Sequence, residues 1–122
     1  MYLELIAAEI AKVVPETHHE YNNADPVVFP YAVYGVYLDQ APDDGEMTGT
    51  VDIELYDNSG NNKLPIEQLN LQLIQLFEKG FMQDDEDAVT SQFLGSRSIP
   101  TPGNTINRKL IQILIKIHNR RP

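Results

Sequence analysis

The chain has no cysteine and no tryptophan among its 122 residues, and it contains few basic residues. Without cysteine, disulfides, thiolate metal sites and cysteine nucleophiles are excluded, so packing alone must stabilise the fold. Long apolar runs are also missing, since none approaches the roughly 20 residues of a membrane-spanning helix. The first residues, MYLELIAAEIAKVV, contain two glutamates and lack the positive start of a signal peptide, so we expect an intracellular protein.

Basic residues number nine against 18 acidic residues, which gives a net charge of -9. Specific nucleic-acid binding is therefore not expected, because it gains affinity from basic surfaces. All 18 acidic residues lie at or before Asp87, whereas six of the nine basic residues follow it. This asymmetry indicates either opposite charges on neighbouring strands of one sheet or a surface that meets its opposite on another molecule.

The last stretch of the chain carries the clearest pattern. Isoleucines at 111, 113, 115 and 117 alternate with residues that are polar except for Leu114. Because successive side chains of a strand point to opposite faces, this period of two predicts a half-buried strand whose isoleucines line the core. We expect the other strands to pack beside it.

The remaining elements follow from apolar spacing and turn residues. Apolar residues at steps of three and four predict helices over Tyr2 to Val14 and from Pro65 to Lys79. Further strands are expected at Tyr31 to Leu38, at Thr48 to Asp57 and between Asp87 and Gly95. Residues 1–122 then form one α+β domain, a mostly antiparallel four-stranded sheet packed by two helices in the order α-β-β-α-β-β.

The sequence gives little support for a metal site or a catalytic site. The adjacent His18, His19 and Glu20 lack the spacing of a zinc site, so no metal is expected. Asp52 and Glu54 share one strand face, roughly 7 Å apart, and paired carboxylates hydrolyse glycosides. No other feature indicates a sugar pocket, so a hydrolase using these carboxylates with one of the histidines is an alternative, and we expect no catalytic residue and no cofactor.

Several stretches together resemble the small tail-completion proteins of long-tailed bacteriophages, the tail-terminator or tail-to-head joining family. They are PYAVYG from Pro30 to Gly35, TVDIELYDNSG from Thr50 to Gly60, the helix that follows, and the final strand containing Arg108. The resemblance implies a non-enzymatic virion protein at the head-tail junction, assembled in the host bacterial cytoplasm. It further implies a hexameric ring that caps the tail tube, contacts the major tail tube protein and the head-completion or connector protein, and lets DNA pass through.

A ring uses a heterologous interface, in which one patch of a subunit meets a different patch of the next subunit. The acid-rich and base-rich parts of this chain would supply such patches. We therefore predict that arginines face carboxylates of a neighbour or another virion component, with these candidate residues: Asp39, Asp43, Asp44, Glu46, Asp84, Asp85, Glu86, Asp87, Arg97, Arg108, Arg120 and Arg121. A small acidic binding or adaptor module that neutralises a basic partner is the other alternative.

Overall fold

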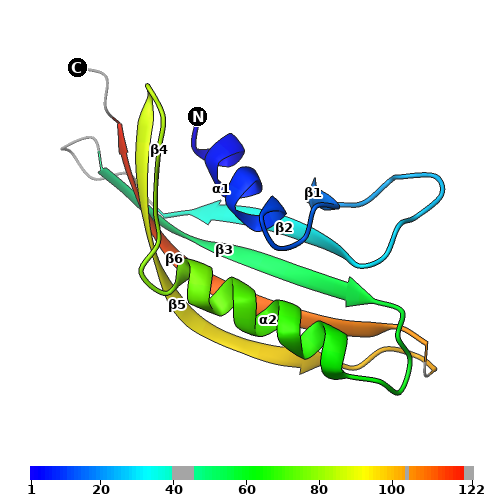
Figure 1. Cartoon of the computed structure of the whole chain (residues 1–122). Helices are drawn as coiled ribbons and strands as arrows, with labels where there is room; N and C mark the ends of the chain where they lie inside the picture. The colour runs from blue at the N-terminus through cyan, green and yellow to red at the C-terminus, as the bar shows by residue number, and fades with distance from the viewer. Residues whose placement is uncertain (40–45, 104, 120–122) are drawn as a thin grey trace.

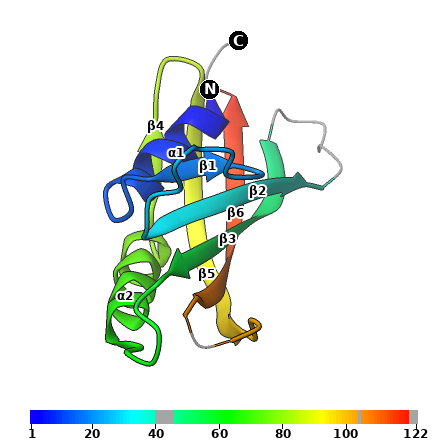
Figure 2. The same cartoon turned by 90° about the vertical axis from the view of Figure 1, so that its right-hand side faces the viewer.

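The computed structural model describes residues 1–39, 46–103 and 105–119. The helices and strands of this part of the chain, in order, are α1 (Tyr2–Ala11), β1 (Thr17–His19), β2 (Tyr31–Leu38), β3 (Glu46–Asp57), α2 (Leu64–Phe77), β4 (Phe81–Gln83), β5 (Asp87–Ile99) and β6 (Asn107–Asn119). The long strands curve, so that the sheet curls into a half-barrel with both helices on its inner side (Figure 1 and Figure 2).

The six strands form one mixed sheet in the order β1-β2-β3-β6-β5-β4. Strand β6 lies between the two longest partners and is antiparallel to both, with Ile113 opposite Val51 of β3 and Phe93 of β5. Only β1 pairs in parallel, with Thr17 opposite Ala32 of β2. The predicted organising strand is therefore confirmed as a central strand of the sheet.

The isoleucine row of β6 lies on the inner face of the sheet, and all four side chains are 0% exposed. Helix α2 covers this face with Leu73 and Phe77, while α1 contributes Ile6 and Ile10. Complete burial of an isoleucine side chain stabilises a fold by about 1.5–3 kcal/mol. This row is thus the centre of one core shared by the sheet and both helices.

Residues at both ends of α2 allow the helix to pack against the sheet in this position. Pro65 lies in the first turn of the helix, where a missing N–H costs little. After the helix, a Cβ on Gly80 would lie 2.3 Å from the Ser91 hydroxyl, and that hydroxyl donates a hydrogen bond to the Phe77 carbonyl at 2.8 Å. Glycine therefore lets the chain pass close to β5 and enter β4.

The predicted fold class is wrong. Instead of a four-stranded antiparallel sheet in the order α-β-β-α-β-β, the structure has a six-stranded mixed sheet with three strands before α2 and three after it. The sequence predicts no strand between Val14 and Tyr31 or between Lys79 and Asp87, where β1 and β4 lie. Each of these strands has three residues, too few to show an alternating pattern.

Two element lengths also differ from the prediction. Helix α1 ends at Ala11 rather than Val14, although Val14 still reaches the core with 0% exposure. Strand β5 continues to Ile99, four residues beyond the Gly95 boundary of the predicted strand. The glycine and serines there have low strand propensity, but pairing with β6 holds them in the sheet.

Candidate functional site

The outer face of the sheet, opposite the helices, carries a cluster that joins three strands. Glu54 of β3 accepts hydrogen bonds from Arg108 of β6 and from the Tyr56 hydroxyl, each at 2.7 Å. Tyr56 stacks on Tyr31 of β2 with ring centroids 4.6 Å apart, and the guanidinium of Arg108 lies 5.4 Å from the Tyr56 ring. Arg108, predicted as an interaction residue, thus already has an intramolecular carboxylate partner.

Proton affinities in this cluster follow from those contacts. Partial burial, followed by the hydrogen bond to Glu54, raises the pKa of Tyr56 to about 12. The hydrogen bond to Glu54 raises the pKa of Arg108 above its ordinary value. Tyr56 therefore stays neutral and Arg108 stays charged at physiological pH.

The predicted acidic residues gather at the opposite end of the sheet. Asp87 of β5 pairs with Asn119, and Glu46 of β3 pairs with His118, whose imidazole Nδ1 lies 3.7 Å from the Glu46 carboxylate. Asp39 follows β2 and accepts a hydrogen bond from the Thr48 hydroxyl at 3.3 Å. These acids therefore lie around the C-terminal end of β6, away from Arg97 and Arg108.

The turn between β4 and β5 holds the other predicted acids. Asp84 accepts hydrogen bonds from the backbone N–H groups of Glu86 and Asp87, each at 2.8 Å, and from the N-terminal ammonium of Met1. The ammonium contact, with the two N–H groups, lowers the pKa of Asp84 to about 2. Asp85 and Glu86 are exposed, whereas Asp87 is buried. Asp84 therefore acts first as a turn-forming residue.

Arg97 lies on the outer face of β5, exposed and opposite Leu110 of β6. No carboxylate within the described ranges pairs with it. Eight residue steps of β6 lead from Leu110, opposite Arg97, to His118, which corresponds to about 26 Å of strand. Contact between Arg97 and the distant acids therefore requires a second molecule. The remaining predicted residues, Asp43, Asp44, Arg120 and Arg121, lie outside the described residues.

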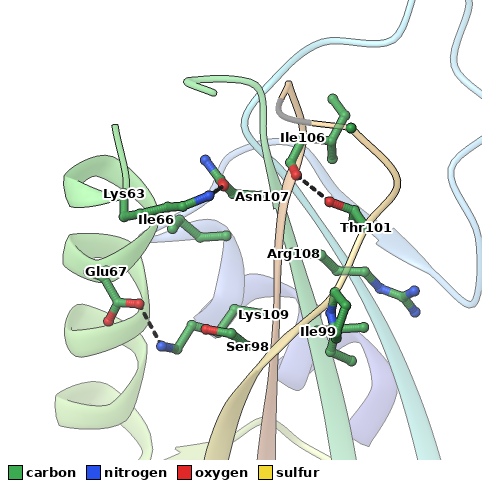
Figure 3. Close-up of a pocket in the computed structure, with 12 residues that line it drawn as sticks. Lys63, Ile66, Glu67, Ser98, Ile99, Thr101, Ile106, Asn107, Arg108 and Lys109 are labelled. Atoms are coloured by element: carbon green, nitrogen blue, oxygen red, sulfur yellow. Dashed lines mark hydrogen bonds and ion pairs between the residues drawn. The ribbon is translucent and has the colours of Figure 1, made fainter. Parts of the chain in front are cut away.

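A cavity of about 340 Å³ opens between the first turn of α2 and the connection from β5 to β6 (Figure 3). Its charged groups are paired: Lys109 donates to Glu67 at 2.6 Å, and the Lys63 ammonium donates to the Asn107 amide oxygen. Arg108 points to the other side of the sheet, as Figure 3 shows. The cavity thus presents no free nucleophile or base among these side chains.

Sequence reasoning missed Lys109, which is only 9% exposed on the inner face of β6. A signal was present, because Lys109 has the same parity as the isoleucine row and so had to point toward the core. It also missed Glu20, the one described non-glycine residue with a positive φ, at 69°. No sequence pattern marks that conformation.

The residues of the hydrolase alternative do not converge. Asp52 and Glu54 lie beside a hollow of about 280 Å³, but Asp52 accepts a hydrogen bond from Gln112 and Glu54 is committed to Arg108. His18 is opposite Val33 of β2 and does not line the hollow, and His19 is in ring contact with Tyr34, 5.0 Å between centroids. In the described chain, no group of three or more metal-ligating side chains occurs.

Neither described helix is long and apolar enough to cross a bilayer. What the chain presents is a curled mixed sheet with two inner helices and a polar, largely self-paired outer face. No family model and no curated protein matches the chain.

Solved structures share this fold over nearly the whole chain. One, named only by a sequence identifier, superposes with a TM-score of 0.70 at 16% identity and covers 99% of this chain and 93% of its own. Another belongs to the virion of a native gene transfer agent particle, with a TM-score of 0.69 at 12% identity over 95% of this chain and 90% of its own. The chain therefore has a fold that also occurs in a virion component.

Proposed function

We propose that this protein is a structural component of a virion and acts in tail completion. It caps the tail tube as a ring and joins the tube to the head connector. The observation that carries the proposal is the likeness to the gene transfer agent virion component, which spans 95% of this chain and 90% of that one. Because almost the whole chain of both proteins is included, the likeness concerns the complete domain rather than a shared motif.

The charge arrangement supports assembly through unlike patches. Asp39, Glu46 and Asp87 lie at one end of the sheet and Arg97 lies toward the other, so Arg97 cannot reach these three acids within one copy. In a ring, each subunit presents one patch to the subunit before it and the other patch to the subunit after it. Long-range attraction between opposite patches also speeds assembly and disfavours wrong orientations.

The partners in this proposal are further copies of the chain, six to a ring, the major tail tube protein and the head-completion or connector protein. DNA passes through the ring without base-specific contact, in keeping with a net charge of -9. The protein works without a cofactor and is not an enzyme, since its role consists of holding other proteins in register at the head-tail junction.

Electron microscopy of the purified protein, alone and mixed with tail tubes of the cognate particle, tests the proposal. We expect six-fold rings at one end of each tube, and heads that join only ring-capped tubes. An unrelated acidic protein of similar size serves as the control for non-specific decoration. Tubes that join heads equally well without the protein would refute the role. Binding of a single copy to one basic protein, with no ring, would favour the adaptor alternative.

A further inference from the structure

One edge of the sheet is open along half of β5. Strand β4 pairs with β5 only at Ala88, Val89 and Thr90, and the Ser91 N–H donates to the Gly80 carbonyl at 3.0 Å. From Gln92 to Ile99, no described strand lies beside β5 on the side away from β6. An edge of this kind presents unpaired backbone groups that can pair with another strand.

The opposite side of the sheet is open along half of β2. Strand β1 covers β2 only from Ala32 to Tyr34, and the Glu20 N–H makes the last bond, to the Tyr34 carbonyl at 2.8 Å. Glu20 has a φ of 69°, a left-handed conformation in which the chain leaves the sheet edge. In the described chain, Gly35 to Leu38 therefore have no strand partner on that side.

The two open edges match in direction and in face. Strand order places them on opposite sides of the sheet, and the alternation of β2, β3, β6 and β5 makes β5 antiparallel to β2. A second copy set beside the first with its sheet continued would thus pair its β5 edge antiparallel to β2. Arg97 and Gly35 both belong to the outer face, so their side-chain positions would lie on the same side of the joined sheet.

Charge and apolar exposure select one register. Beside Gly35 lies the hollow of about 280 Å³, which is lined by the carboxylates of Glu20, Asp52 and Glu54. A Cβ on Gly35 would lie 3.0 Å from the Tyr37 hydroxyl, so the Tyr37 ring lies over this glycine and forms one wall of the hollow. Arg97 is the only charged residue from Gln92 to Ile99.

With Arg97 opposite Gly35, Gly95 comes opposite Tyr37, and Leu94 comes near Leu38. Leu94 is 51% exposed and Leu38 is 39% exposed, so the same register covers two apolar side chains that a single copy leaves in water.

We propose that copies of this chain associate head to tail by adding the open edge of β5 in one copy to the open edge of β2 in the next, with Arg97 entering the acidic hollow beside Gly35. The contact is heterologous, as a ring requires, and it rests on the proposed function for the number of copies. Backbone pairing supplies affinity, and the arginine with its carboxylates fixes the register.

A charge exchange tests the contact. Arg97→Glu and Glu20→Arg should each weaken self-association at least about tenfold in sedimentation velocity, and the double variant should recover most of that loss. Lys116→Glu is the matched control, because Lys116 is exposed on the same outer face but on a strand paired on both sides. It should change self-association less than about twofold. Circular dichroism confirms that each variant is folded.

Cysteine cross-linking tests the register directly, because the chain has no cysteine of its own. Gly95→Cys with Tyr37→Cys should give a ladder of covalent oligomers on mild oxidation. Both positions tolerate the change, since a Cβ on Gly95 meets nothing within 4 Å and Tyr37 is 60% exposed. Gly95→Cys with Gln72→Cys, on the exposed side of α2, should give no ladder.

The outcomes separate this contact from the proposed function. If the wild type forms rings that Arg97→Glu leaves intact, and the cysteine pair does not cross-link, the contact is wrong while the ring stands. If Arg97→Glu keeps the ring but loses the tube or the connector, the β5 edge serves another protein and the contact is again wrong. Cross-linked chains without a six-fold ring would keep the contact and overturn the ring. No self-association, alone or on tubes, would overturn both.

Discussion

The two faces of β6 differ in the contacts that their side chains make. On the inner face the isoleucine row is fully buried against both helices, and the buried Lys109 on the same face is paired with Glu67. On the outer face the side chains alternate between paired polar groups and exposed ones, with Arg108 bound to Glu54 and Lys116 in solvent. The inner face therefore carries most of the apolar burial, whereas the outer face is held by the Arg108–Glu54–Tyr56 cluster and the buried Leu110.

The difference also limits what the outer face offers a partner. Arg108 is paired with Glu54, whereas Asp52 accepts a hydrogen bond only from the neutral Gln112 amide, so the middle strands keep one uncompensated carboxylate among these groups. Attraction between copies then depends on groups at the sheet edges, where Arg97 and Glu20 lie. Charged groups at the two sheet edges suit association side by side rather than face to face.

The largest expected loss of stability comes from shortening a buried side chain on the inner face. Ile113→Ala should lower the free energy of unfolding by about 2–5 kcal/mol, because it removes buried methyl groups and leaves a cavity. Lys116→Ala, three residues along on the outer face, should change it by less than about 0.5 kcal/mol. Urea denaturation followed by circular dichroism measures both. Equal losses of unfolding free energy in the two variants would contradict the difference between the inner and outer faces.

A second test concerns the buried charge on the inner face. Glu67→Gln leaves the Lys109 ammonium without its carboxylate and should cost about 1 kcal/mol, near the low end for a buried unpaired group because Glu67 itself is half exposed. Lys109→Met should be nearly neutral, since an apolar side chain of similar length needs no partner.

Adding Glu67→Gln to Lys109→Met should then cause no further loss, and denaturant titration of all four proteins closes the cycle. A full additional loss in the double variant would show that Glu67 stabilises α2 independently of Lys109.

The sequence predicted those helices and strands whose apolar side chains lie on one face. The isoleucine row required a strand with a core on one side, and the apolar stripe from Ile66 to Phe77 required a helix over it. Strands β1 and β4 could not be predicted, because three residues carry no period and their pairing depends on neighbours brought close by the fold. The strand from Gly95 to Ile99 could not be predicted either, because only its pairing with β6 places it in the sheet.

The separation of acids before Asp87 from later basic residues does not become two ends of the sheet. Arg108 is paired with Glu54 at one end, and His118 lies opposite Glu46 at the other. The Arg108 partner was not predictable, because Glu54 lies 54 residues earlier and reaches it only through the pairing of β3 with β6. Choosing between the intramolecular and intermolecular interpretations of a charge requires strand order, which composition does not contain.

The outer cluster predicts an effect of alkaline pH on stability. Because the pKa of Tyr56 is about 12 when folded and 10 when unfolded, only the unfolded phenol ionises between these values. The stabilisation is therefore complete below pH 10 and is lost as the pH rises toward 12. Tyr56→Phe should flatten this alkaline loss of stability, and Glu54→Gln should lower the pKa of Tyr56. Phenolate absorbance of folded protein measures the titration, and a Tyr56 pKa near 10 would contradict the cluster geometry.

The smallest expected effect lies at the acidic end, in the turn formed by Asp84. Its folded pKa of about 2 lies below the ordinary value of 3.8, so its stabilisation is present above pH 4 and is lost as the pH falls through that window. Asp84→Asn weakens the contacts to the Glu86 and Asp87 N–H groups and should lower the thermal midpoint slightly at pH 7. Asp85→Asn, one residue away and exposed, should leave the midpoint unchanged. Because solvent screens both carboxylates, a large loss from either variant would mean that this end of the sheet, and not only its inner face, holds the fold together.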